Sequence, residues 1–218
     1  MNFFNMVLNF IYTPVCGICG KDSRDFLCDK CFREYSNKEI ANIEINKEPN
    51  FYFDEKIHLF MYKDEIRNKI IDYKFNGKAY LYKTFSEFFV KNKKINVFFE
   101  KYDIIIAVPM HKKKEKIRGY NQSALIAKEI AKKNNKLKFE NDILLKIINN
   151  KVQSTLSKKE RKINVKNAYK VLEKQKLINK NVIIFDDIYT TGNTVNECAR
   201  ILKENGANKI GILTIAKD

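Results

Sequence analysis

The second half of the chain alternates between two kinds of hydrophobic pattern. Residues 103–108, 181–185 and 209–216 are short, continuous apolar runs, which are typical of strands buried on both faces of a sheet. Between them, residues 121–133 and 194–204 carry apolar positions at helical spacing. Because apolar strands that alternate with helices form parallel sheets, we predict an α/β domain whose parallel sheet is flanked by helices.

The pattern before residue 100 predicts shorter elements. We expect an amphipathic helix over residues 1–12, packed on the body of the protein, and a polar connector over residues 37–55. A strand over residues 56–62 and helices over residues 64–75 and 79–93 follow,. In the first of these helices we expect one core-facing apolar side, formed by Ile66, Ile70, Ile71 and Phe75.

Composition and charge narrow the class of protein. The 218 residues are 44% hydrophobic and 12% aromatic, enough for a sizeable core, and the formal net charge is +16,. Such a surplus suggests polyanionic partners, although a general enrichment in Lys, Asn and Ile explains part of it. No apolar run is long enough to span a bilayer, and the N-terminus lacks a signal-peptide pattern,. We expect a cytoplasmic protein, with a peripheral place at the inner face of the membrane as the alternative.

The stretch 182–194, VIIFDDIYTTGNT, is the most informative one. Its apolar residues predict a buried strand that ends at two adjacent carboxylates, Asp186 and Asp187, on the ligand edge of an open α/β sheet. The short polar loop that follows leads into a helix, so its backbone N–H groups and hydroxyls can face a phosphate. Gly192 allows close backbone approach. Carboxylates beside a phosphate cradle predict a sugar phosphate ligand.

This stretch resembles the phosphoribosyl pyrophosphate (PRPP) motif of type I phosphoribosyltransferases. The resemblance implies that Asp186 and Asp187 bind the ribose hydroxyls, directly or through Mg²⁺. It also implies that the 5′-phosphate is held by Thr190, Thr191, Gly192, Asn193 and Thr194. No catalytic residue is assigned.

The stretch after the strand 103–108 is a second candidate site. In a phosphoribosyltransferase, the first core strand leads into a loop that holds pyrophosphate, and several cations suit a diphosphate. We expect residues 112–118 to form that loop, with Arg118 as its ligand and His111 as a further candidate. For the lysines, a solvated charge run is an equal alternative; they are Lys112, Lys113, Lys114 and Lys116.

The segment between the two motifs is polar and basic. Residues 142–148 predict a further strand, and residues 149–165 lie where a phosphoribosyltransferase has the flexible loop that closes over PRPP,. The polar lid candidates are Gln153, Ser154, Arg161 and Asn164. The same cations suit a DNA backbone, with Tyr120 and Tyr169 as stacking residues. Core packing is the interpretation we favour for both tyrosines.

Four of the five cysteines form the pattern C-x₂-C, eight residues, C-x₂-C, at Cys16, Cys19, Cys28 and Cys31. Two such pairs can complete a tetrahedral Zn²⁺ site, and four thiolates leave no open position, so we expect structural zinc. An iron site and disulfides are the alternatives. Disulfides are disfavoured if the protein is cytosolic, because that compartment keeps thiols reduced. We expect Cys198 and His58 to be structural.

The motifs together identify the chain as a member of the ComF family. Besides the PRPP motif and the cysteines, PMH at 109–111, RGYNQ at 118–122, QSTL at 153–156 and RKINVKNAY at 161–169 resemble its signature. The resemblance implies handling or import of single-stranded DNA in natural transformation, beside a helicase-like ATPase. The alternatives are an active phosphoribosyltransferase that uses PRPP and Mg²⁺ on an unidentified acceptor, and a regulator that only senses PRPP.

These expectations divide the chain into three parts. Residues 1–36 hold the N-terminal helix and the Cys₄ zinc module, and residues 37–100 are a connector and a hood-like segment. Residues 101–218 form a domain of the type I phosphoribosyltransferase fold.

Overall fold

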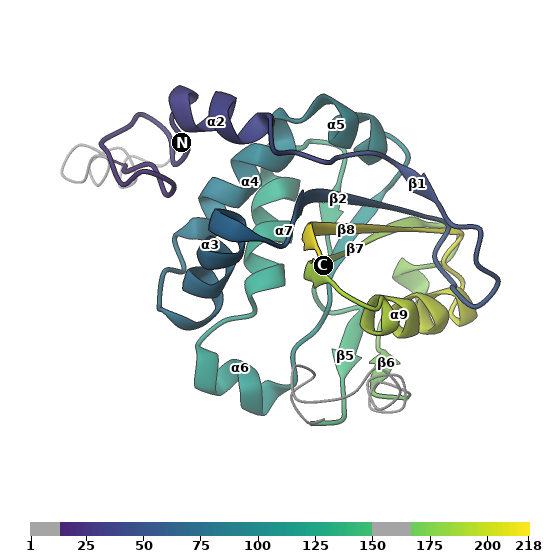
Figure 1. The fold of residues 1–218 in the computed structure, drawn as a ribbon. Coiled ribbons are helices and arrows are strands. Elements are labelled where there is room, and N and C mark those ends of the chain that lie inside the picture. Colours follow the sequence, from purple (N-terminus) through teal and green to yellow (C-terminus); the bar gives the residue numbers. More distant parts are fainter. Residues whose placement is uncertain (1–13, 150–166) are drawn as a thin grey trace.

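The computed structural model describes residues 14–149 and 167–218 (Figure 1). The helix expected over residues 1–12 and the four lid candidates lie outside the described residues; the candidates are Gln153, Ser154, Arg161 and Asn164.

A six-stranded sheet with the order β1-β2-β8-β7-β3-β4 forms the centre of the fold. Every neighbouring pair is parallel except β1 and β2, which confirms the predicted α/β class. The strands are β1 (Glu44–Ile45), β2 (Glu55–Met61), β3 (Ile104–Ala107), β4 (Lys138–Phe139), β7 (Asn181–Tyr189) and β8 (Lys209–Lys217).

Helices cover both faces of this sheet. On one face, side chains of α3, α4, α5 and α7 share a core cluster with β2, β3, β7 and β8, and α9 packs on the other face with a second cluster. Figure 1 shows α3, α4 and α7 on one side of the strands and α9 on the other. The helices are α2 (Asp29–Ser36), α3 (Asp64–Phe75), α4 (Leu81–Lys91), α5 (Lys93–Phe99), α6 (Lys112–Arg118), α7 (Gln122–Lys133) and α9 (Asn193–Glu204), with a 3₁₀ turn η2 (Lys174–Lys176).

Strand β7 extends further than the apolar pattern predicts. It pairs with β3 only as far as Phe185, opposite Ala107, but it stays paired with β8 as far as Tyr189. Asp186 and Asp187 therefore lie within a strand, beyond the end of its neighbour β3. The expectation that the strand ends at this pair is wrong by a few residues, because β8 continues to supply hydrogen-bonding partners.

The strand expected over residues 142–148 is not part of the parallel sheet. Its observed part, β5 (Leu144–Lys146), pairs antiparallel with β6 (Tyr169–Val171) in a separate two-stranded sheet. The position beside β3 is taken by the short strand β4 instead.

Helix α3 has the predicted bounds but not the predicted core face. Ile66 and Ile70 are buried, whereas Phe75 is 66% exposed and Tyr73 is fully buried in its place. Tyr73 tolerates burial because its hydroxyl donates a hydrogen bond to the carbonyl oxygen of Gln122 at 2.7 Å,. Phe75 is the last residue of α3, so the chain turns away before a further helical turn can cover it.

The segment 37–100 contributes directly to the sheet, because β2 pairs with β8 over most of its length. The helix expected over residues 79–93 ends at Asn92, whose side chain accepts a hydrogen bond from the backbone N–H of Ile95 at 2.9 Å and so begins α5, an unpredicted helix,. The expected boundary at residue 100 stays a prediction. Among the described residues, no helix has the length and apolar character needed to cross a membrane.

Candidate functional site

A cleft of about 620 Å³ opens at the carboxyl edge of the parallel strands. One side is formed by the end of β7 and the loop into α9, and the other by Tyr62 and by Ile71, Lys74 and Phe75 of α3. Arg118 and Gln122 also line it. The structure thus brings together most of the predicted PRPP ligands: Asp186, Asp187, Thr190, Thr191, Gly192, Asn193, Thr194 and Arg118.

Asp187 is held by two side chains from different helices. Its Oδ2 lies 2.8 Å from Nζ of Lys74 on α3 and accepts a hydrogen bond from Nε2 of Gln122 on α7 at 3.0 Å. Burial alone would raise its pKa, but the Lys74 ammonium and the Gln122 amide outweigh burial and hold the pKa below its ordinary value,. Asp187 therefore carries a negative charge at neutral pH.

Asp186 has a different environment. Its Oδ1 accepts hydrogen bonds from the hydroxyl of Ser123 at 3.3 Å and from the backbone N–H of Asp187 at 2.9 Å. Enclosure by the surrounding atoms and the neighbouring charge of Asp187 raise its pKa to about 7,. The two carboxyl groups therefore share less than two full negative charges at neutral pH, and a cation at this position would favour full ionisation.

The loop after β7 is shaped for close approach. Gly192 has a positive φ of +71°, and a Cβ atom there would lie 2.4 Å from the hydroxyl oxygen of Tyr189, so only glycine fits,. Gly192 also begins α9 without a side-chain cap. The N-terminus of α9, with its positive dipole end, thus lies beside the cleft, as an anion requires,.

Residues 112–118 form helix α6 and not the expected loop. The Nδ1 atom of His111 accepts a hydrogen bond from the backbone N–H of Lys113 at 3.2 Å, which caps the start of the helix. Gly119, with φ of +87°, ends it,. Arg118 is the last residue of α6, and its guanidinium lies 5.1 Å from the ring centre of Phe75.

The remaining candidates near α6 lie elsewhere. Among the described residues, the cleft lining includes neither His111 nor the four lysines of α6. A contact between His111 and a ligand stays a prediction.

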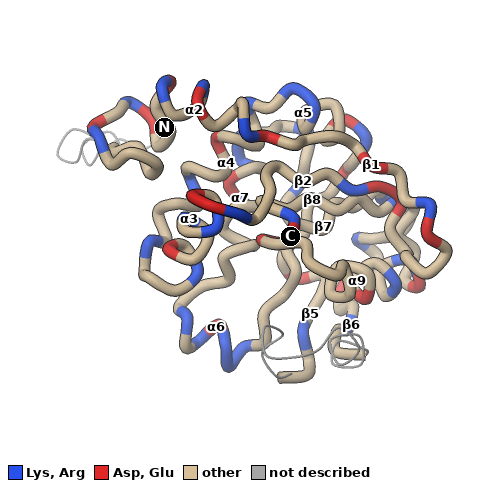
Figure 2. Tube along the Cα trace, viewed as in Figure 1, with Lys and Arg blue, Asp and Glu red and all other residues tan. Residues whose placement is uncertain are grey.

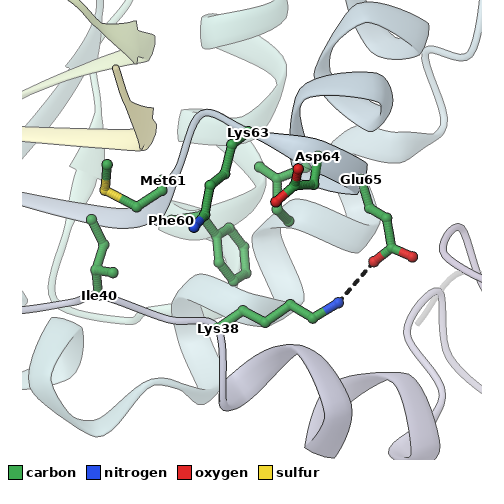
Figure 3. A pocket seen from close by; sticks show the side chains of 8 residues that line it. Lys38, Ile40, Phe60, Met61, Lys63, Asp64 and Glu65 are labelled. Carbon is green, nitrogen blue, oxygen red and sulfur yellow. Dashed lines mark hydrogen bonds and ion pairs between the residues drawn. The ribbon is translucent and has the colours of Figure 1, made fainter.

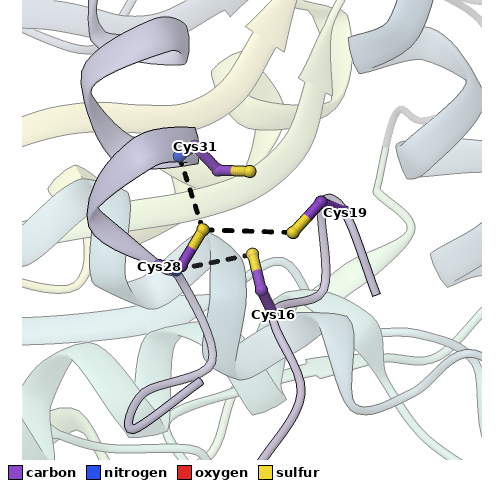
Figure 4. A group of neighbouring side chains, drawn as sticks. All are labelled: Cys16, Cys19, Cys28 and Cys31. Carbon is purple, nitrogen blue, oxygen red and sulfur yellow. Dashed lines mark hydrogen bonds between the residues drawn. The ribbon is translucent and has the colours of Figure 1, made fainter. Parts of the chain in front are cut away.

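The four predicted cysteine ligands form one cluster (Figure 4). All four Sγ atoms lie within 4.8 Å of one another, and none of the cysteines forms a disulfide. Backbone N–H groups, that of Cys28 first, outweigh burial and lower the pKa of Cys16 to about 7, while burial and the other thiols raise the pKa of Cys31. A bound cation would favour the thiolate form of its ligands, because metal binding to cysteine releases the thiol protons.

Contacts with α3 and α4 fix the cysteine loop to the body of the protein. Nζ of Lys69 donates hydrogen bonds to the carbonyl oxygens of Gly17 and Ile18 at 3.0 and 2.8 Å, and the Thr84 hydroxyl donates to the carbonyl oxygen of Phe26 at 2.9 Å. At Gly17 a Cβ atom would lie 2.2 Å from Oγ1 of Thr84. The loop thus packs against α4 at backbone distance.

The residues expected to be structural are buried. Cys198 is fully buried, and His58 is buried in β2 with Nδ1 2.8 Å from Oγ1 of Thr214. Tyr169 is buried in the second core cluster. The Tyr120 ring stacks on Tyr73, and its hydroxyl donates to the carbonyl oxygen of Tyr73 at 2.7 Å, so core packing is the correct interpretation of both tyrosines.

Lys74 is the contact that sequence reasoning missed. It is one of several cations on α3, and nothing in its local pattern separates it from Lys69 or Lys78. At the other end of α3, a smaller cavity of about 330 Å³ lies between the end of β2, the start of α3 and the segment that follows α2, where Lys38 pairs with Glu65 at 2.8 Å (Figure 3). It contains none of the predicted site residues.

Comparisons with known proteins agree with this geometry. The family model of the phosphoribosyl transferase domain matches residues 121–218. Competence protein F of Haemophilus influenzae is 26% identical, over 100% of this chain and 99% of that protein. Competence protein ComFC of Bacillus subtilis is 25% identical over 88% of this chain and 72% of that protein.

A shorter match involves DNA utilization protein YhgH of Escherichia coli O6:H1, which is 30% identical over 53% of this chain and 49% of that protein. The match to competence protein F extends over the whole chain, and the transferase domain contains most of the cleft. With the cysteine cluster present as well, this chain is similar to competence protein F over its whole length, and its residues 121–218 match the phosphoribosyl transferase domain.

Proposed function

We propose that this protein binds PRPP with Mg²⁺ in the cleft and serves the handling or import of single-stranded DNA during natural transformation. The observation that carries the first part is the cleft itself, where Arg118 lies beside a carboxylate pair and a phosphate loop of the matched domain. The names of the relatives, two competence proteins and a DNA utilization protein, support the second part.

We assign each part of PRPP to a different set of cleft residues. Asp186 and Asp187 would bind the ribose hydroxyls, the loop Thr190 to Thr194 would bind the 5′-phosphate, and Arg118 would bind the pyrophosphate,. The carboxylate oxygens are hard donors of the kind that Mg²⁺ prefers. When bound, the ion would neutralise part of the pyrophosphate charge. Asp187 already has Lys74 as a cationic partner. Asp186 is therefore the carboxylate that a bound Mg²⁺ ion would stabilise most.

The cysteine cluster suits structural zinc. A Zn–S distance of about 2.3 Å in a tetrahedron places sulfur atoms about 3.8 Å apart, and the Sγ atoms of Cys19 and Cys28 lie 3.9 Å apart. Four sulfur donors match a soft or borderline cation and complete its coordination. Cys16, Cys19, Cys28 and Cys31 would hold it.

The DNA partner is supported by charge. The net charge of +16 favours contact with a phosphate backbone,, and α6 presents four lysines and Arg118 with only one acidic residue (Figure 2). We place the protein in the cytoplasm, with the inner face of the membrane as an alternative, where a helicase-like ATPase would act on the same strand.

Turnover of PRPP is the alternative function. The observation that favours it is the α3 side of the cleft, whose apolar side chains have no counterpart in a sugar phosphate. Release of pyrophosphate from Mg²⁺-PRPP on addition of nucleobases would establish transfer.

The decisive test of binding is calorimetry with Mg²⁺-PRPP. Replacing Asp186 and Asp187 together with Ala should abolish detectable binding, because both ribose and metal contacts disappear. The matched control replaces Asp64 and Glu65, an acidic pair at the far end of α3, which removes the same charge and should leave the affinity intact. Unchanged affinity in the Asp186 and Asp187 variant would refute the site.

A further inference from the structure

Phe75 is an exposed aromatic residue in the lining of the cleft. It is 66% exposed, so α3 forgoes much of the roughly 1.5–3 kcal/mol that burying such a side chain contributes. Single exposed apolar residues are common, but this one lines the cleft and lies against Arg118. Its position is also fixed, because α3 ends there and Gly77, with φ of +68°, reverses the chain.

The α3 side of the cleft differs chemically from the β7 side. Beside Lys74, the α3 side contributes the apolar side chains of Tyr62, Ile71 and Phe75. The other side combines carboxylates, hydroxyls and backbone N–H groups with Ile188, Tyr189 and Val195. A ribose with its phosphates gains little from an apolar surface, since its groups all require polar partners. A flat, unsaturated ring fits the α3 side, and both sides open into the same cavity.

Arg118 prepares Phe75 for stacking. Its guanidinium lies 5.1 Å from the centre of the ring, within the distance of a cation–π contact. The planar cation stabilises one orientation of the ring and leaves the rest of the side chain exposed to solvent. Every nucleobase has a π face that can stack on such a ring, without dependence on base identity.

Positive charge continues from this ring along α6. None of the seven residues of α6 is buried, and five of them are Lys or Arg. Figure 2 shows α6 as a largely basic segment below α3. Aromatic stacking beside a cationic track is the combination that binds single strands without sequence preference.

We propose that the α3 side of the cleft is a nucleobase subsite, in which the exposed face of Phe75, backed by Arg118, stacks on one base of a single-stranded nucleic acid whose phosphates follow α6. The proposal rests on the proposed function, in that PRPP occupies the β7 side of the same cleft. It adds the residue that contacts a base and the place where the strand enters.

The chain contains no tryptophan, so Phe75→Trp provides both a conservative replacement and a single fluorescent reporter. Titration with a short oligothymidylate should quench this fluorescence, and an abasic oligonucleotide of equal length should leave it unchanged. Tyr52→Trp is the matched control, because Tyr52 is 48% exposed and is not among the residues that line the cleft. Its fluorescence should not respond to either strand.

Free thymidine distinguishes the two sources of a base. Quenching by thymidine as strong as by the oligothymidylate supports the subsite and assigns it to a free base or nucleoside. Stronger quenching by the oligothymidylate supports the subsite and assigns it to a strand. Absence of quenching by both ligands, or equal quenching by the abasic strand, would overturn the proposal.

Phe75→Ala tests the affinity and keeps the two proposals separate. It should weaken oligothymidylate binding by about tenfold, the loss expected for one stacked base, while its abasic-strand binding stays near the wild-type value. Tyr52→Ala should leave both affinities unchanged. Equal oligothymidylate affinity with intact PRPP binding would refute the subsite alone. Loss of PRPP binding in the wild-type protein itself would refute the proposed function instead.

Discussion

The cysteine cluster is a candidate metal site and the cleft is a candidate phosphate site, but they are built in different ways. All four sulfur ligands come from the short stretch between Cys16 and Cys31. The cleft takes side chains from α3, α6, α7 and the β7–α9 connection, which are far apart in the sequence. A local site is readable from spacing alone, whereas an assembled site shows only the part that lies in one motif.

The two sites also depend on different sources of stability. The cleft lies on a sheet whose strands β7 and β8 are buried almost throughout, so its backbone is held without a ligand. The cysteine loop contains an exposed ligand, Cys19, and short segments of structure. We expect its conformation to depend on a cation held by the four cysteines and on its contacts with α3 and α4. Variants should therefore separate the two regions.

The largest effect is expected from Cys28→Ser. Structural zinc contributes about 10–16 kcal/mol of binding free energy in small zinc modules, so loss of one ligand should release the metal and unfold residues 14–36. Elemental analysis should find about one Zn²⁺ per chain in the wild type and none in the variant. Amide exchange should rise in the cysteine region only, and Cys198→Ala should retain the metal. A variant with full metal content would contradict the assignment.

A smaller effect is expected from Lys74→Met. Removal of this ammonium leaves Asp187 without its ion-pair partner, and both side chains are largely buried, at 17% and 10% exposure. We expect a loss of about 3 kcal/mol in the free energy of unfolding, as for other buried pairs that lose one partner. Mg²⁺ should restore part of it by supplying positive charge.

Lys78→Met is the control for that measurement. Lys78 pairs with Asp72, and these side chains are 44% and 24% exposed, so urea unfolding should detect little change in stability. Similar losses in both variants would show that Lys74 has no special role in the cleft.

Gly17→Ala tests how the cysteine loop is attached. The new methyl group would lie 2.2 Å from Oγ1 of Thr84 and 2.8 Å from Cδ2 of Leu81, so the loop must move away from α4. Overpacking of this kind costs about 2 kcal/mol. Thermal unfolding of the double variant with Thr84→Ala should recover part of the loss, whereas strictly additive effects would argue against the contact.

The smallest effect is a pH dependence at His58, which lies 4.8 Å from the cleft residue Tyr189 between ring centres. Burial lowers the pKa of His58 to about 4, below the ordinary value near 6.5. The unfolded chain therefore binds a proton first as the pH falls through 6.5, and stability decreases between about pH 6.5 and 4.

Between pH 7 and about pH 5.5, the wild type should lose about 1 kcal/mol more than His58→Gln in urea unfolding. Parallel losses in the two proteins would show that another group is responsible.

Local pattern predicted those elements whose environment is uniform. The bounds of α3 are as predicted, and β3, β7 and α9 lie within a few residues of their expected places, because a continuous apolar run or a regular helical face leaves few alternatives. The position of Asp186, Asp187 and the following loop at the cleft was predicted from the single motif at residues 182–194.

The errors have two origins, which are local helix capping and tertiary contacts. Residues 112–118 resembled a ligand loop because their charges gave no core face, yet the cap at His111 and the stop at Gly119 make a helix without one. Phe75 followed the apolar spacing of α3, but Tyr73 occupies the core because Gln122 supplies a partner for its hydroxyl. The role of Lys74 required knowledge of which carboxylate lies beside it.

Helix α3 contacts both sites, so an insertion or deletion within this helix would change the position of one site relative to the other. Lys69 holds the cysteine loop from the middle of the helix, and Lys74 and Phe75 reach Asp187 and Arg118 from its end. One residue inserted between positions 69 and 74 would turn the end of the helix by about 100° relative to the middle. Insertions and deletions along this stretch would therefore detach one site from the other.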